Sequence, residues 1–352
     1  MNNKGGETRM PTTFKECRAA TLGLWESDPE CARLSAKWAK VVGRAGALIH
    51  EPRKLFHQWH PLRVYTSVTR MRGGAGRMTF SLRFKGQEVG ELHVGKGGEV
   101  RLKVSAKQAS DNAEYFKVLV GDRNAASDWS WARDKQAKQF RRLFADAYRS
   151  QSGERVPKQP EHQVESLILE EMQKTTKTNK FNGTLWGIQP ILVAGCPFQF
   201  PLPIAASGGT PRRGNGNIDI LARTGRASLA VWEIKKPHLG LGSKAHLQAY
   251  AYALTLAKML REGESGRAWY RAMGFNSGLP SSLTIEAAAV FGNISPQWQD
   301  RIVQGFAEEI RSNSGELRLG RDRIQPRVVF YETDHEIDPR TVKIVKIASA
   351  TK

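Results

Sequence analysis

Two carboxylates and one lysine lie in strongly apolar surroundings in the second half of the sequence. Asp219 is part of the run GNIDIL (216–221), and Glu233 and Lys235 are part of the run LAVWEIK (229–235). Unpaired charges among apolar neighbours are costly, and like charges directly opposite each other on a sheet repel. A divalent cation bound by both carboxylates would remove this conflict. These residues therefore predict a metal site with an ammonium group beside it.

The two runs are predicted to be the strands of one hairpin. Both are β-prone, a turn signal separates them, and Asp219 and Glu233 lie equally far from Arg226. Residues directly opposite in an antiparallel pair have Cβ atoms roughly 5 Å apart, so the two carboxylates would face each other. Alternation along the strand puts Lys235 on the same face as Glu233. The alternative is an ordinary Glu233–Lys235 ion pair on a solvated edge strand, with Asp219 elsewhere.

A largely apolar helix is predicted after this hairpin, over residues 245–254. Gln248 and Tyr252 are four residues apart and so share one face of that helix. The alternative for these two is a core tyrosine beside an edge glutamine.

A second helix is predicted upstream, over residues 161–172, following Pro160 and with apolar residues at core spacing. Glu165 flanks the apolar stripe of this helix and is a candidate ligand. Its neighbours are expected to be ordinary solvated glutamates, namely Glu161, Glu170 and Glu171.

On these residues the chain resembles the PD-(D/E)xK nuclease superfamily. The resemblance implies that Asp219, Glu233 and the carbonyl of Ile234 bind Mg²⁺, for which Mn²⁺ would substitute. It further implies that Lys235 orients or deprotonates the attacking water, and that Glu165 completes the metal shell. The products of such an enzyme would carry 5′-phosphates.

The predicted helix that carries Gln248 and Tyr252 resembles that of the RecB-type members of the superfamily, in which these side chains would position Lys235 or the phosphate. One departure is that Asn217 and Ile218 precede Asp219 where the name-giving proline would stand. The resemblance implies an α/β fold with a restriction-endonuclease-like mixed central sheet flanked by helices. Further strands near 283–291, 328–331 and 342–345 and a helix near 297–312 agree with such a core.

The chain has 352 residues and a formal net charge of +20. Such a charge attracts phosphate backbones and favours binding through counterion release, so we expect DNA, most simply double-stranded DNA, as the partner. No feature reads a 2′-hydroxyl group, which leaves RNA open. No basic amphipathic helix, lipid motif, long apolar run or signal peptide stands out, so we expect a cytoplasmic protein without a membrane partner. The oligomeric state, including a homodimer, is left open.

Two domains are expected from the length, with a boundary in the polar, Gly- and Pro-containing stretch 150–160. Residues 154–352 would form the nuclease domain. Residues 1–153 would form a smaller basic α+β domain that recognises DNA. Helical patterns over 14–42 and 130–149 are predicted to enclose an antiparallel meander of strands near 78–84, 88–94 and 99–104.

Basic residues are expected on the solvated face of the meander, where they could lie on a phosphate backbone, although they are also the usual residues of any solvated face. From this face we assign Arg83, Arg101 and Lys103 to nucleic-acid binding. Arg212 and Arg213 upstream of Asp219, and His238 in the loop after the Lys235 strand, are further candidates for phosphate contact. For His238 an ordinary loop histidine is the alternative.

Three scattered cysteines, Cys17, Cys31 and Cys196, fit neither a zinc site nor a disulfide framework and are expected to be reduced thiols. Taken together, the sequence favours a Mg²⁺-dependent DNA endonuclease of restriction or phage defence. Two alternatives stay open at this point: an end-dependent exonuclease of recombination or repair, and a non-catalytic nucleic-acid-binding protein in which the acidic pair is structural.

Overall fold

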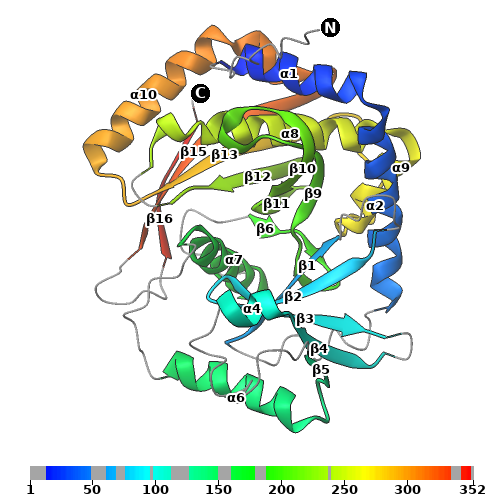
Figure 1. Ribbon diagram of the computed structural model, residues 1–352. Coiled ribbons are helices and arrows are strands. Elements are labelled where there is room, and N and C mark those ends of the chain that lie inside the picture. The colour runs from blue at the N-terminus through cyan, green and yellow to red at the C-terminus, as the bar shows by residue number, and fades with distance from the viewer. Residues whose placement is uncertain are drawn as a thin grey trace, which may run out of the picture.

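The fold is that of a computed structural model, which describes residues 13–48, 61–68, 76–95, 98–111, 127–149, 160–178, 188–236, 239–333 and 342–349. The described chain is mixed α/β, as the sequence predicts, and its two larger sheets are linked by helices and by a two-stranded ribbon (Figure 1). Within these residues no helix combines the length and hydropathy needed to span a bilayer. All three cysteines are buried free thiols.

The central sheet is mixed, with parallel strands in its middle. β12 (Ser228–Ile234), β13 (Thr284–Gly292) and β15 (Asp322–Thr333) run parallel, whereas β11 (Ile220–Gly225) pairs antiparallel with β12. The strand order is β14-β15-β13-β12-β11-β6, and β16 pairs with β15. The remaining strands of this sheet are short or lie at its edges: β6 (Gln189–Pro190), β14 (Arg318–Leu319) and β16 (Val342–Ser349).

Helices cover both faces of the central sheet. Alternate residues of β12, such as Leu229 and Val231, pack on the side of α8 (Ala245–Arg261), while Ala230 and Trp232 pack on the side of α7 (Pro160–Thr178). Figure 1 shows α8 and α7 on opposite sides of these strands. Near-continuous apolar strands are expected where a sheet is buried on both faces.

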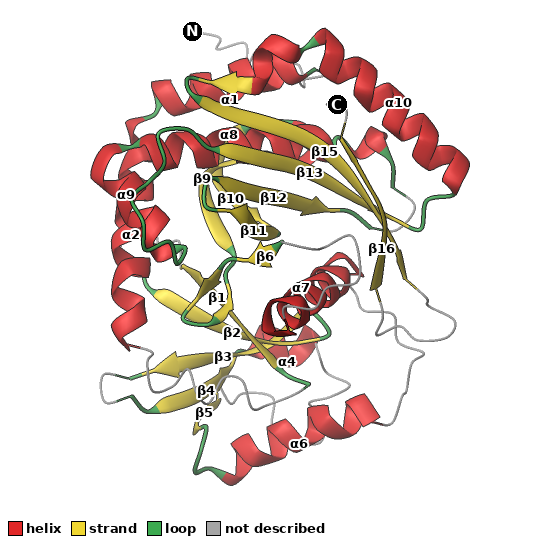
Figure 2. Ribbon diagram, turned by 180° about the vertical axis from the view of Figure 1, so that it is seen from behind, coloured by secondary structure: helices red, strands yellow, loops and turns green. Residues whose placement is uncertain are grey.

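Helix α8 is itself buried nearly all around, which explains why its sequence is apolar on every face. Its outer side is covered by α1 (Phe14–Ser27), where the Phe14 and Tyr250 rings meet edge-on at 4.8 Å. Helix α2 (Pro29–Leu48) packs on α9 (Gly263–Ala272), and Trp269 Nε1 donates to the Ser35 carbonyl at 3.1 Å. The helix α10 (Pro296–Ser312) completes this layer (Figure 2).

A second, antiparallel sheet forms the meander that the sequence predicts. Its strands are β1 (Arg63–Val68), β2 (Met78–Phe84), β3 (Gln87–Val94), β4 (Val100–Val104) and β5 (Ser127–Ser130), in that order. Its apolar face is covered by α6 (Lys135–Arg149), where Phe84 and Phe144 lie 5.0 Å apart between ring centroids. A short helix, α4 (Ala106–Asp111), follows β4. We call the sheet of β1 to β5 the accessory sheet.

The other face of the accessory sheet is not fully solvated, because α7 lies against β1 and β2. Tyr65 packs in one apolar cluster with Val164 and Ile168 of α7. Arg83, expected on an open face, is therefore buried, with 6% of its surface exposed. Its assignment to nucleic-acid binding is a misplacement that alternation along β2 could not reveal, since the covering helix comes from another part of the chain.

Packing also crosses the predicted domain boundary, whose residues 150–159 lie outside the described part. α1 and α2 share the core of α8, so these two helices pack with the predicted nuclease domain, and α2 also contacts β1 and β2 of the accessory sheet. Thr66 of β1 accepts a hydrogen bond from Gln199 N at 2.8 Å through its carbonyl. The two predicted domains thus share apolar cores and backbone hydrogen bonds.

Candidate active site

The hairpin of β11 and β12 ends beside Asp219 and Glu233. Its last pair is Ile220 with Trp232, and Asp219 and Glu233 are the next residue on each side of that pair. Asp219 lies at a bend, where the ribbon strand β10 (Arg212–Ile218) gives way to β11. Its Oδ2 accepts a hydrogen bond from the Ile234 amide at 2.8 Å. The Asp219 side chain therefore ties its own strand to the end of β12.

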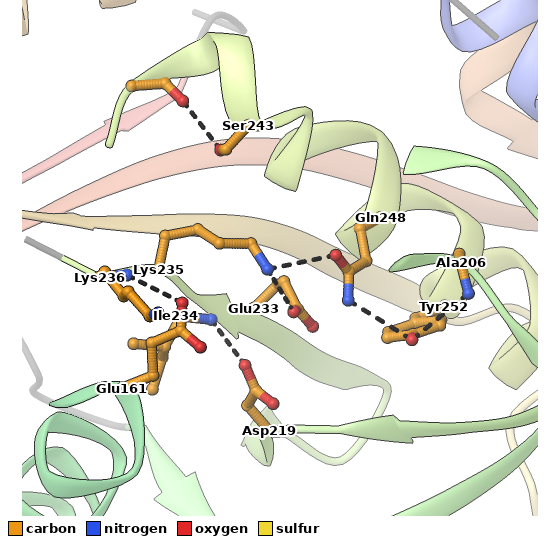
Figure 3. Close-up of polar contacts among 11 residues, drawn as sticks. Glu161, Ala206, Asp219, Glu233, Ile234, Lys235, Lys236, Ser243, Gln248 and Tyr252 are labelled. Atoms are coloured by element: carbon orange, nitrogen blue, oxygen red, sulfur yellow. Dashed lines mark hydrogen bonds and ion pairs between the residues drawn. The ribbon is translucent and has the colours of Figure 1, made fainter. Parts of the chain in front are cut away.

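A chain of polar contacts leads from Glu233 across the sheet face to α8 (Figure 3). Lys235 Nζ lies 2.9 Å from Glu233 Oε1 and donates to Gln248 Oε1 at 3.2 Å. Gln248 Nε2 contacts the Tyr252 hydroxyl at 3.4 Å, and that hydroxyl also accepts from the Ala206 amide at 3.4 Å. The structure thus brings together all four side chains that the sequence analysis placed on this strand and helix.

Two glycines permit the close packing on which this chain of contacts depends. A Cβ atom at Gly216 in β10 would lie 2.4 Å from the Ile204 carbonyl oxygen and 3.0 Å from the Tyr252 ring. At Gly292 a Cβ atom would lie 2.0 Å from the ring of Tyr331. The Tyr331 hydroxyl in turn donates to the Lys235 carbonyl at 3.1 Å. Glycine at these positions lets both tyrosines approach the backbone of the site.

The carboxyl groups of Asp219 and Glu233 both have raised pKa values, even though the Lys235 ammonium lies beside them. Burial, followed by the charge of Glu233, raises the pKa of Asp219 well above its usual range. Burial also raises the pKa of Glu233 to about 7, although the Lys235 ammonium opposes this shift. Both carboxylates therefore resist ionisation, chiefly because burial disfavours their charged forms.

Lys235 is held in its charged form. Burial alone would lower its pKa, but the carboxylates of Glu233 and Asp219 outweigh burial and raise it. Tyr252 keeps its proton, since burial and the nearby Glu233 raise its pKa to about 12. The site thus presents a fixed ammonium and a neutral phenol, both of which can donate hydrogen bonds.

Helix α7 brings two further carboxylates to the same end of the sheet. Glu165 is buried, with 2% of its surface exposed, and its charge acts on both Asp219 and Glu233. His162 Nδ1 lies 3.3 Å from Glu165 Oε2. One turn earlier, Glu161 Oε1 accepts from the Lys236 amide at 3.1 Å (Figure 3). Glu161 is thus partly exposed, as expected of a solvated glutamate, but it also binds the backbone at the end of β12.

The donor set fits a hard divalent cation better than it fits a closed ion pair. Glu233 Oε2 and Glu165 Oε1 are buried carboxylate oxygens without a hydrogen-bond partner among the described residues. Oxygen anions are the ligands that Mg²⁺ and Mn²⁺ prefer. In the described part of the chain, however, no three His, Cys, Asp or Glu side chains converge closely enough to form a ready metal cage. Asp219, Glu233 and the Ile234 carbonyl would supply two carboxylates and one backbone oxygen.

The residues assigned to nucleic-acid binding lie at different distances from this site. Arg101 and Lys103 are on β4 of the accessory sheet, about half exposed, and both face Asp128, at 2.7 and 3.9 Å. Arg212 is exposed on β10, the strand that leads to Asp219, and next to it Arg213 Nε lies 3.3 Å from Asp28 Oδ2. His238 lies outside the described residues.

Sequence reasoning missed Glu161, Gly216, Gly292 and Tyr331. Only Glu161 carried a usable signal, because it precedes Glu165 by four residues and so shares its helical face. Tyr331 lies 96 residues from Lys235, and no local pattern connects the two. Comparison with protein-family models finds no matching family, and searches of curated proteins and of solved structures find no similar protein.

Proposed function

We propose that this protein is a metal-dependent deoxyribonuclease that hydrolyses phosphodiester bonds at the end of β12. One observation carries the proposal. The Lys235 ammonium lies 2.9 Å from Glu233 and 3.2 Å from Gln248 at the end of a buried strand. Between Glu233 and Lys235, the Ile234 amide donates to a second carboxylate, Asp219. A scaffold has no need of raised carboxylate pKa values and orphaned oxygens, whereas perturbed groups of this kind cluster at functional sites.

The roles follow from the positions of the side chains. When bound by Asp219, Glu233 and the Ile234 carbonyl, Mg²⁺ would polarise the phosphate and lower the pKa of a water. Lys235, kept charged by Glu233, donates to the attacking water or to a phosphate oxygen and offsets charge that develops there. Gln248 accepts from Lys235 and so fixes the direction of its ammonium. Tyr252 holds Gln248 against the ribbon of β9 (Phe200–Ala205) and β10.

DNA as the substrate is supported by the net charge of +20, which favours binding of a polyanion. The mixed central sheet with helices on both faces supports the finer expectation of a restriction-endonuclease-like core. The accessory sheet, with Arg101 and Lys103 on its partly exposed strand β4, is a surface that could hold duplex on one side of the scissile bond. We therefore favour an endonuclease of restriction or phage defence.

A second candidate function is an end-dependent exonuclease of recombination or repair. The observation that favours it is the contact between Lys235 and the Gln248–Tyr252 pair of α8, the helix that resembles that of RecB-type nucleases. The two functions share one active site. They differ in how DNA reaches it, because an endonuclease must accept a closed duplex and an exonuclease needs a terminus.

Several unmodified, covalently closed circular DNAs of high sequence complexity, each also in linear form, test these candidates together. Incubation with Mg²⁺, Mn²⁺ or EDTA is followed by gel electrophoresis, with Asp219→Asn protein as the control for contaminating nucleases. We expect metal-dependent cutting of closed circles that Asp219→Asn abolishes. Intact circles with linear forms degraded from the ends would favour the exonuclease. DNA that is bound but never cut, with either metal, leaves the non-catalytic binding protein.

A further inference from the structure

The accessory sheet contacts α7 in the first helical turns, which carry Glu161 and Glu165. The contacts come from two of its strands and from the turn between β2 and β3. On β1, Arg63 Nη1 lies 3.4 Å from the Ser166 carbonyl oxygen, and Arg63 also pairs with Glu170. Arg83 of β2 contacts the neighbouring residue Glu165, and Gly86 of the turn lies against His162, one turn earlier.

The Arg83 contact is a buried ion pair between the two parts of the fold. Its Nη1 lies 3.5 Å from Glu165 Oε1, and the side chains of the two residues are 7% and 3% exposed. The guanidinium stacks over the ring of Tyr65, 4.3 Å from its centroid. Neither Nη1 nor Oε1 finds a hydrogen-bond partner among the described residues. Arg83 therefore balances the Glu165 charge without saturating the oxygen that faces it.

The Gly86 contact is steric and carries no charge. Gly86 has a φ of 79°, and a Cβ atom there would lie 1.9 Å from the His162 carbonyl oxygen and 2.8 Å from the Gln163 nitrogen. Backbone meets backbone at this point, so a side chain could be accommodated only by moving the hairpin or the helix. The β2–β3 turn thus fixes how far the first turn of α7 extends toward the catalytic hairpin.

We infer that the accessory sheet is a positioning element for the proposed metal site, holding α7, and with it Glu165, against the end of β12. The inference rests on the proposed function. It assigns to Arg83 and Gly86 the positioning of α7, a role that does not involve contact with DNA. The alternative is that these contacts only stabilise the fold. Residues Val164, Ile168 and Met172 already dock α7 in an apolar cluster with β11 to β13 and β15, so stability and positioning can be separated by experiment.

Gly86→Ala is the direct test, because it displaces the helix turn without changing any charge. Gly98→Ala is its matched control: Gly98 has the same φ of 79°, but a Cβ atom there meets no described atom within 4 Å. Both variants therefore carry similar backbone strain, and only one presses on α7. Affinity for Mn²⁺ alone, without DNA, is measured by calorimetry on the full chain. We expect Gly86→Ala to weaken Mn²⁺ binding roughly 10-fold relative to Gly98→Ala, as for other residues that orient metal ligands.

A double-mutant cycle distinguishes positioning of Glu165 from general loosening. If Gly86→Ala acts through Glu165, it should have little further effect on Mn²⁺ affinity in a Glu165→Gln background. Additive losses would overturn the inference, as would equal affinities for the Gly86 and Gly98 variants or an unchanged affinity in Glu165→Gln. In each of these cases wild-type binding and cleavage would leave the proposed function intact. If the wild-type protein binds no Mn²⁺ and cuts no DNA, both the inference and the proposed function are refuted.

Arg63→Gln provides a milder variant should Gly86→Ala fail to fold. It removes the Glu170 pair and the contact with the Ser166 carbonyl, at a partly exposed position and without touching a proposed ligand side chain. We expect a smaller loss of Mn²⁺ affinity than the roughly 10-fold loss of Gly86→Ala, with cleavage restored at high metal concentration. Affinity within error of wild type in this variant would likewise count against the inference.

Discussion

The two ends of the central sheet both bury charge, but they do so in opposite ways. Where β15 begins, Asp322 is 1% exposed, accepts from Arg261 Nε at 2.8 Å and from the Leu283 amide at 2.7 Å, and forms a second contact with the Arg261 guanidinium. Where β12 ends, the carboxylates of Asp219, Glu233 and Glu165 share Lys235 and Arg83 as their neighbouring cations.

This difference is the one expected between a structural ion pair, at Asp322, and a candidate functional site, at Asp219 and Glu233. At Asp322 one carboxylate meets a guanidinium whose geometry matches it, and the pair joins the end of α8 to the start of β15. At Glu233 and Glu165, buried oxygens have no hydrogen-bond partner in the described part of the chain, and burial raises the pKa values of Asp219 and Glu233. Loss of the first arrangement should cost stability alone. The second arrangement costs stability as it stands, and under the proposed function a bound cation would offset that cost.

Lys235→Ala should produce the largest effect, on chemistry alone. The variant loses the ammonium that faces the reacting groups, and removal of one preorganised donor typically slows a reaction about 100- to 1000-fold. Duplex affinity should barely change, because one positive charge of many is removed. Lys236→Ala, at the exposed neighbouring position, is the matched control. Single-turnover cleavage and filter binding at fixed salt measure both quantities, and a normal cleavage rate in Lys235→Ala would refute the site.

Asp322→Asn should affect stability alone. It gives Arg261, whose side chain is partly exposed, a neutral partner, and loss of a hydrogen bond to a charged group typically costs about 1.5 to 3 kcal/mol. Cleavage at a temperature where the variant is folded should match wild type. Glu264→Gln, which breaks the exposed pair with Arg267, should leave the urea midpoint within error. A catalytic defect in folded Asp322→Asn would show that the two ends of the sheet are not separate in function.

Asp219→Asn should reverse the usual direction of a buried substitution. The folded protein binds protons at this pair more tightly than the unfolded chain, because the pKa of Asp219 is raised and that of Glu233 reaches about 7. The free energy of unfolding of the wild-type protein in EDTA should therefore fall as pH rises from about 4 to 7. Over the same range the free energy of unfolding of Asp219→Asn should fall by less. At pH 7.5 the variant should be more stable by about 1 kcal/mol.

Added Mg²⁺ should invert that order, since it stabilises wild type by about 2.7 kcal/mol at 100 times its Kd and the variant by less. Urea unfolding at pH 5 and 7.5, with EDTA or Mg²⁺, measures all four cases. Equal pH dependence of the two proteins in EDTA would mean that the carboxylates carry no electrostatic penalty.

Lys103→Gln should give the smallest effect, confined to DNA affinity. Loss of one phosphate contact weakens binding to all sequences alike and lowers the slope of log affinity against log salt by about 1. Asp128 forms ion pairs with both Lys103 and Arg101 and so competes with phosphate for them. Asp128→Asn should therefore strengthen DNA binding. Lys40→Gln on α2 controls for net charge alone. Unchanged affinity in both Lys103→Gln and Asp128→Asn would remove the accessory sheet from the DNA path.

The hairpin of β11 and β12 and the Gln248–Tyr252 pair were predictable because local periodicity determines both. Equal spacing about Arg226 gives the register that pairs Ile220 with Trp232, and a four-residue interval puts Gln248 and Tyr252 on one helical face. The break between α1 and α2 at Asp28 and Pro29 is also a local signal, although the sequence analysis treated 14–42 as one helical region.

What escaped prediction depends on contacts between distant segments. Alternation along β2 correctly separates Phe84 from Arg83, but only the fold shows that α7 covers the face to which Arg83 belongs. Length and the polar stretch 150–160 suggested independent domains, and nothing local indicated that α1 would lie on α8. Gly86 is a further case, because its contact partner His162 is 76 residues away in the sequence.

The packing of α1 and α2 on α8 and α9 has a consequence for how the chain folds during synthesis. Trp269 donates to Ser35 across 234 residues, and Cys17 Sγ contacts the Leu247 carbonyl across 230. At a translation rate of roughly 5 to 20 residues per second, the first helices leave the ribosome roughly 10 to 50 s before their partners exist. Until then Phe14, Trp25 and Trp38 have no α8 or α9 to pack against. Newly made chain is thus prone to association, and chaperone supply should set the yield of folded protein.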